Sequence, residues 1–271
     1  MKDAITDKIK SLPPLSQTFI DVNRVCANED SSISDLVKVL ENDPMIVANI
    51  LKLANSPLYN FGREIKNISQ AVSRFGMNTT RSIVIEHSIR KLLNVDMQPY
   101  GITSEKFAKI SLIQSTLIMN WYKQIDREKA DELYLAAFLQ EVGKILIANY
   151  IIQENELVSF SSEINLSNNI AQVEKIYADV TSAEVSANVF KHWNFDENFI
   201  DMINYSDTPS KAPQDIKEYA IALNIIKTIV SVNQPLSERA INFGLQKANK
   251  AGYNHELLED EVNKIIDTIN I

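Results

Sequence analysis

The stretch Leu139-Gln140-Glu141-Val142-Gly143-Lys144-Ile145 lies in an apolar run whose periodicity predicts a helix over about 129–151. It combines polar and charged side chains with a glycine. A glycine in a helix interior costs about 1 kcal/mol relative to alanine. The simplest explanation of Gly143 is that a second helix packs closely against it.

The rest of the chain also has the pattern of an all-α protein. With 6 glycines and 8 prolines in 271 residues, it has few of the turn signals that a many-stranded fold needs. Apolar residues recur instead at helical spacing. The pattern predicts a helix over about 1–10 and a second one that starts at Leu12-Pro13-Pro14-Leu15 and reaches about residue 28. It predicts further helices over about 33–40, 44–54, 68–75, 78–94, 104–124, 153–163, 168–178, 182–193, 196–205, 214–232, 236–250 and 255–269.

Gln98-Pro99-Tyr100-Gly101 is the best candidate for a domain boundary, because two turn-forming residues stand between predicted helices. It divides the chain into an N-terminal helical bundle, residues 1–97, and a second helical part, residues 98–271. We find no internal repeat.

The composition favours a cytoplasmic protein that binds neither nucleic acid nor membranes. The net charge is −8 and the isoelectric point about 5.0, whereas nucleic-acid binders carry a basic face. Only the basic segment 63–91 would suit such a role. The single cysteine, Cys26, allows no disulfide within the chain, which suits a reducing compartment. The N-terminus lacks the apolar region of a signal peptide, and no run approaches the roughly 18 apolar residues of a membrane span.

Several motifs, in order, resemble the HDOD (HD-related output domain) family of bacterial signalling modules. The resemblance covers roughly residues 12–208 and leaves a C-terminal helical tail. The motifs are Leu12-Pro13-Pro14-Leu15, Asp43-Pro44, Leu53-Ala54-Asn55-Ser56 before Tyr59, Ala71-Val72 before Phe75-Gly76, and Thr181 to Val185 with Trp193.

In this resemblance, residues 139–145 stand where HD phosphohydrolases carry a metal-binding His-Asp pair before an apolar residue, a glycine and a lysine. Here the pair is Gln140-Glu141. A glutamine amide is a weak neutral ligand, and glutamate carries its carboxylate one methylene further out than aspartate. The other positions of the relict site are Ser182, Ser206 and Asp207, with Ile110 in place of an early histidine. The three histidines, His87, His192 and His255, do not precede an aspartate. We therefore expect no metal, no other cofactor and no catalytic residue.

The resemblance implies an N-terminal helical bundle packed on an HD-like helical domain, usually without catalysis. It implies a role in bacterial signal transduction, tied to motility, biofilm, virulence or stress regulation, and we favour motility. We expect the chain to act by binding a signalling protein, or a small regulatory ligand in the relict cavity with Lys144 and Glu184 as contacts. The sequence identifies neither the partner nor the oligomeric state.

Two alternatives remain open. The chain could be a divergent metal-dependent phosphodiesterase if Glu141, Glu184 and Asp207 converge, but Glu184 also fits a capping box with Thr181. Tyr59 and Phe61, in a loop near a glycine, could form a partner surface, because aromatic residues dominate interface anchors. They could equally pack the loop onto the N-terminal bundle.

Overall fold

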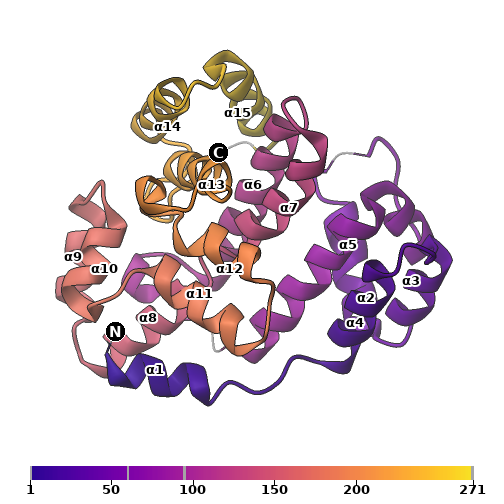
Figure 1. Cartoon of the computed structure of the whole chain (residues 1–271), viewed down its shortest axis with the longest axis horizontal. Helices are drawn as coiled ribbons and strands as arrows, with labels where there is room; N and C mark the ends of the chain where they lie inside the picture. The colour runs from indigo at the N-terminus through magenta and orange to yellow at the C-terminus, as the bar shows by residue number, and fades with distance from the viewer. Residues whose placement is uncertain (1, 60, 94–95, 270–271) are drawn as a thin grey trace. The chain divides into compact units, whose positions relative to one another are not determined.

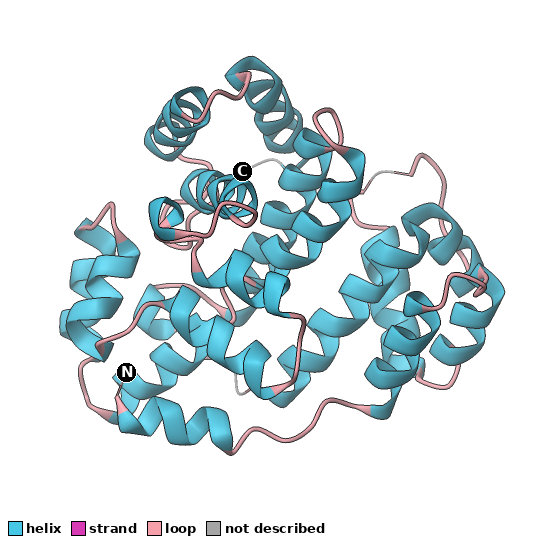
Figure 2. Cartoon of the chain, viewed as in Figure 1, coloured by secondary structure: helices cyan, strands magenta, loops and turns pink. Residues whose placement is uncertain are grey.

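A computed structural model describes residues 2–59, 61–93 and 96–269, except the side chains of residues 90 and 92. Within these ranges every regular element is a helix and no strand occurs, as Figures 1 and 2 show along the chain. The prediction of an all-α fold is confirmed.

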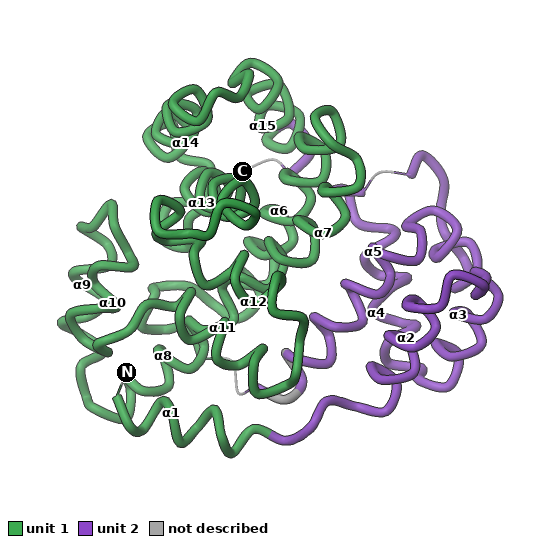
Figure 3. The backbone as a smooth tube through the Cα atoms, in the orientation of Figure 1, with its two compact units in different colours: residues 1–12, 94–266 green, residues 13–93, 267–271 purple. Residues whose placement is uncertain are grey.

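The chain divides into two compact units, coloured separately in Figure 3: residues 1–12 with 94–266, and residues 13–93 with 267–271. The division near residue 93 lies close to the predicted boundary at 97. Residues 1–12, however, belong to the larger unit rather than to the N-terminal bundle. The reason is that helix α1 (Asp3–Lys10) packs on α8 (Gly143–Gln153) and α11 (Ser182–His192), with Ile5 and Ile9 buried.

The smaller unit contains α2 (Gln17–Ala27), α3 (Ile33–Leu40), α4 (Pro44–Ala54) and α5 (Ile68–Leu92), and α5 packs on the other three. Local signals set these boundaries. The Asp43 carboxylate accepts from the backbone N–H groups of Met45 and Ile46, and Pro44 starts the helix. Gly76, at φ 78°, interrupts α5, as the two predicted helices required.

The larger unit contains α1, the helices from η1 to α14, and α15 as far as residue 266. Helix α13 is central to it because it packs on α6, α7, α12 and α14. The helix α8 packs on α1, α10 and α11. The bounds are η1 (Gln98–Tyr100), α6 (Ser104–Tyr122), α7 (Arg127–Leu139), α9 (Leu157–Leu166), α10 (Ile170–Ala178), α12 (Glu197–Asn204), η2 (Pro209–Lys211), α13 (Lys217–Ile229), α14 (Glu238–Lys250) and α15 (His255–Ile269).

The single helix predicted over 129–151 is wrong. The helix α7 ends at Leu139, residues 140–142 form a turn, and α8 begins at Gly143. Gly143 is therefore the first residue of a helix, not an interior one. The close approach that it suggested is confirmed, because a Cβ at this position would lie 2.8 Å from Ser186 N and 2.9 Å from Ser186 Oγ.

Arg127–Gln153, which spans α7 and α8, is long and apolar enough to cross a membrane by length and composition alone. Of its most apolar 18-residue window, 83% is buried inside the protein. These two helices thus supply core to the larger unit.

Candidate functional site

At the start of α8 the Lys144 ammonium is buried between two carboxylates. Its Nζ lies 3.1 Å from Glu141 Oε2 and 2.6 Å from Glu174 Oε1, and it donates to Ser182 Oγ at 2.9 Å. The charged side chains are at most 2% exposed. Burial lowers the pKa of Lys144, but the two carboxylates outweigh burial and the pKa is raised. Lys144 is therefore charged at neutral pH, and its single positive charge lies between the two glutamates.

Glu174, on α10, is held by groups from two other elements. The Tyr100 hydroxyl donates to Oε1 at 2.9 Å, and the backbone N–H of Ser182 donates to Oε2 at 2.6 Å. Burial, reinforced by the Glu174 charge, places the pKa of Tyr100 well above its usual value, so the phenol keeps its proton and remains a donor. Lys144 Nζ also lies 5.1 Å from the centre of the Tyr100 ring.

A second ion pair joins the segment after α12 to α13. Lys227 Nζ donates to Asp207 Oδ1 at 2.8 Å, and both side chains are about 10% exposed. Burial raises the pKa of Asp207, but Lys227 and then Lys144 outweigh it, so the pKa is lowered. The preceding residue, Ser206, is fully buried, and its carbonyl accepts from Asn224 Nδ2 at 2.6 Å.

Gln140 is fully buried in the turn between α7 and α8. Its Nε2 donates to Gln114 Oε1 at 2.9 Å, and Gln114 Nε2 donates to the Val230 carbonyl at 2.8 Å. The Ser186 hydroxyl donates to the Gln140 carbonyl at 2.9 Å and accepts from Gly143 N at 2.7 Å. Neutral hydrogen bonds thus connect the turn to α6 and α11, and Gln114 extends this network to the end of α13.

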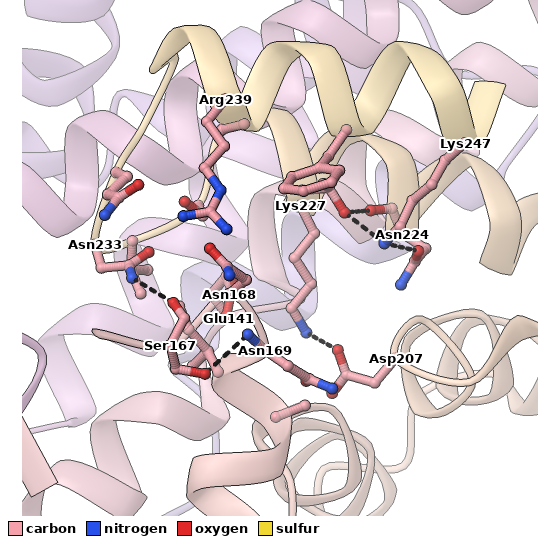
Figure 4. A pocket seen from close by; sticks show the side chains of 18 of the residues that line it. Glu141, Ser167, Asn168, Asn169, Asp207, Asn224, Lys227, Asn233, Arg239 and Lys247 are labelled. Atoms are coloured by element: carbon pink, nitrogen blue, oxygen red, sulfur yellow. Dashed lines mark hydrogen bonds and ion pairs between the residues drawn. The ribbon is translucent and has the colours of Figure 1, made fainter. Parts of the chain in front are cut away.

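Two of the three ion pairs, Lys144–Glu141 and Lys227–Asp207, form the floor of a cavity of about 480 Å³ in the larger unit, shown in Figure 4. Residues 167–171, the segment 231–234 and helices α13 and α14 supply its walls. In Figure 4 the Lys227 side chain points toward Asp207, and Arg239 and Lys247 come from α14 on the other wall. The charged residues that line it are Glu141, Lys144, Asp207, Lys227, Arg239, Lys247 and Lys250.

A family model described as the HDOD domain matches residues 12–209 of the chain. The chain belongs to the HDOD family. The match ends before α13 and α14, so part of the cavity wall lies beyond the HDOD domain.

Similar proteins are known in sequence and structure. An uncharacterised protein of Treponema pallidum (strain Nichols) is 22% identical over 239 residues; these cover 86% of this chain and 44% of that protein, so the chain spans less than half the length of this relative. A phosphohydrolase candidate from Shewanella amazonensis SB2B superposes with a TM-score of 0.74 at 22% identity, over 98% of this chain and 95% of that one. A candidate signal transduction protein from Marinobacter aquaeolei VT8 superposes with a TM-score of 0.74 at 22% identity, over 99% of this chain and 60% of that one. At such identities the likeness shows a shared helical fold and nothing more.

The residues at the positions where the sequence resemblance predicts a relict HD site do not fit a divalent metal. Gln140 is engaged by Gln114, and Glu141 and Asp207 each face an ammonium. A cation at Glu141 would lie beside the Lys144 charge, so repulsion opposes its binding. Within the described part of the chain, no three histidine, cysteine or acidic side chains are grouped to hold a metal.

Glu184 does not join Glu141 and Asp207. It completes the capping box of α11, accepting from Thr181 N at 2.8 Å, and it pairs with the exposed Lys175 at 3.3 Å. Glu184 also does not line the cavity, whereas Lys144 does. The acidic residue that shares Lys144 with Glu141 is Glu174. Sequence reasoning missed Glu174 because it resembles an ordinary surface charge of a helix.

Tyr59 and Phe61 of the HDOD motif region contact each other and Phe75, all within the smaller unit. The Tyr59 ring centre lies 5.9 Å from that of Phe61 and 4.8 Å from that of Phe75. Both loop residues are half-buried. This packing gives the pair a structural role, and whether it also binds a partner stays a prediction.

Proposed function

We propose that this HDOD chain is a non-catalytic cytoplasmic signalling module that acts by binding other molecules, a signalling protein foremost and a small regulatory ligand in the cavity. Membership of the HDOD family and the fold shared with a candidate signal transduction protein support a regulatory role. Motility control is the process that we would test first.

The observation that carries the non-catalytic part is the position of Lys144. Its ammonium lies 3.1 Å from Glu141 and 2.6 Å from Glu174. By the sequence resemblance, Glu141 stands at a position where HD phosphohydrolases carry a metal ligand. The Lys144 ammonium thus already supplies a positive charge to these two carboxylates. Metal-assisted phosphodiester hydrolysis needs a cation with an open position for water or substrate, and the residues here offer an ammonium in its place.

The first experiment measures the metal content of the full chain, purified without chelators or metal affinity columns, and its hydrolysis of bis-p-nitrophenyl phosphate with added Mg²⁺ or Mn²⁺. We expect substoichiometric metal and a rate equal to that of the Glu141→Ala variant. One or two tightly bound ions per chain, together with hydrolysis that Glu141→Ala abolishes, would instead establish the phosphodiesterase.

A second experiment tests whether a protein partner binds through the loop of the smaller unit that carries Tyr59 and Phe61. The double variant Tyr59→Leu, Phe61→Leu keeps apolar packing in this loop but removes the aromatic rings. It replaces the wild-type chain in the test strain. Loss of swimming in soft agar, with an unchanged level of the protein, supports partner binding through this loop in motility control. Unchanged swimming argues against that assignment.

A further inference from the structure

The cavity of the larger unit is strongly cationic although the chain is acidic. Its lining includes five cationic side chains and two carboxylates. Glu174, beneath Lys144, adds a third carboxylate, which leaves an excess of two positive charges. The whole chain, by contrast, carries a net charge of −8. Such local concentration of one sign favours a ligand of the opposite sign.

The excess positive charge of the cavity comes from α14. The floor cations Lys144 and Lys227 are paired, but Arg239, Lys247 and Lys250 form no ion pair with any residue in 2–59, 61–93 or 96–269. Lys247 donates instead to two neutral acceptors, Asn224 Oδ1 at 2.7 Å and Thr228 Oγ1 at 2.8 Å. An ammonium has three donors, so this arrangement orients the Lys247 charge and leaves capacity for an anion. Desolvation lowers the pKa of Lys247, as expected for a cation that lacks a carboxylate.

The same walls carry groups suited to a planar ring. Phe243 lines the cavity, is 42% exposed, and has the Arg239 guanidinium 5.6 Å from its ring centre. The side-chain amides of Asn168, Gln234 and Gln246 also line it. Amides both donate and accept, as the edges of nucleobases require. The volume of about 480 Å³ falls within the range of small-molecule sites, roughly 300–1,000 Å³.

We propose that this cavity binds a nucleotide, with the phosphates against Arg239, Lys247 and Lys250 and the base at Phe243. Inorganic phosphate would use the cations and leave the ring and amides without a role. This inference rests on the proposed function in one respect: the bound nucleotide is a regulatory ligand, not a substrate.

The test is calorimetric titration of the full chain with ATP, GTP, AMP, adenosine and inorganic phosphate. We expect at least one nucleotide to bind at one site per chain, more tightly than adenosine or phosphate, and less tightly as salt rises. Lys247→Met, which keeps the alkyl chain, should weaken that nucleotide's binding by about tenfold or more. Phe243→Leu should weaken nucleotide binding but leave that of phosphate unchanged. Lys191→Met, on an exposed lysine of α11 outside the cavity, is the matched control and should have no effect.

Three outcomes overturn the inference: no nucleotide binds, phosphate binds as tightly as every nucleotide, or Lys247→Met binds as wild type does. In each case a chain that still lacks hydrolytic activity leaves the proposed function standing. If a nucleotide binds and a hydrolysed product is then released, the nucleotide site is supported but the proposed non-catalytic function is wrong.

Discussion

Lys144 Nζ lies 2.6 Å from Glu174 Oε1, and both side chains are at most 2% exposed. Removal of the cation would leave Glu174 and Glu141 buried without a countercharge. Lys144→Met is therefore expected to destabilise the fold by about 3–5 kcal/mol. Urea unfolding at pH 7 measures this. Lys175→Met is the control, because its pair with Glu184 is 41–50% exposed, and such pairs contribute no more than about 1 kcal/mol.

A further variant separates charge from packing. Adding Glu174→Gln to Lys144→Met removes one of the uncompensated charges, so it should recover part of the lost stability. Equal losses for Lys144→Met and Lys175→Met would show that the buried pair carries no special weight.

The Asp207–Lys227 pair predicts a pH dependence of stability. The pKa of Asp207 is lowered from its ordinary value of 3.8, against the effect of burial, mainly by Lys227. The pair therefore stabilises the fold above pH 3.8, and this contribution is lost as the pH falls through the lowered pKa. Asp207→Asn should be less stable than wild type at pH 7, by about 3–5 kcal/mol because Lys227 stays buried and charged.

Unfolding measured in urea at several pH values between about 7 and 2 checks this sign. The stability difference between wild type and Asp207→Asn should begin to shrink as the pH falls below 3.8, and it should continue to shrink down through the lowered pKa of Asp207. Asp260→Asn, on an exposed residue of α15, is the control and should show a small difference throughout. A difference that stays constant down to pH 2 would mean that Asp207 does not titrate as the geometry requires.

The fold could be predicted because its signals are local. Asp43 with Pro44, the Thr181–Glu184 capping box and Gly76 each mark a boundary through neighbouring atoms, and the structure places the helix ends there. The break at 140–142 was missed because the turn residues are buried and apolar residues continue on both sides. Burial depends on the surrounding helices, which periodicity does not describe.

The site could be predicted only in part. The motif positions 140, 141 and 144 lie within five residues of sequence, so the resemblance located them. Glu174 lies 30 residues from Lys144 and contacts it only through the packing of α10 on α8. The cations of α14 belong to the tail beyond the family resemblance, and only the cavity assembles them with Lys227.

Gly143→Ala tests the close approach of α8 and α11. The added methyl would meet Ser186 N and Oγ at 2.8 and 2.9 Å and the Ser182 carbonyl more closely still. Backbone atoms cannot move aside cheaply, so we expect a loss of about 1–3 kcal/mol, measured by thermal or urea unfolding. Gly252→Ala is the comparison, because it has no atom within 4 Å and carries only the strain of φ +86°. A smaller loss at Gly143 than at Gly252 would contradict the steric argument.

Restoring the His-Asp pair should not restore a metal site. In the double variant Gln140→His, Glu141→Asp, the positions Ser182 and Ser206 still supply no imidazole, and Lys144 still places its charge at the site. A divalent cation needs several ligands in one cavity. We expect substoichiometric Mn²⁺ after incubation and dialysis, as for wild type, with circular dichroism showing that the helices persist. One firmly bound Mn²⁺ per chain would show that the missing pair alone separates this chain from a metal-binding relative.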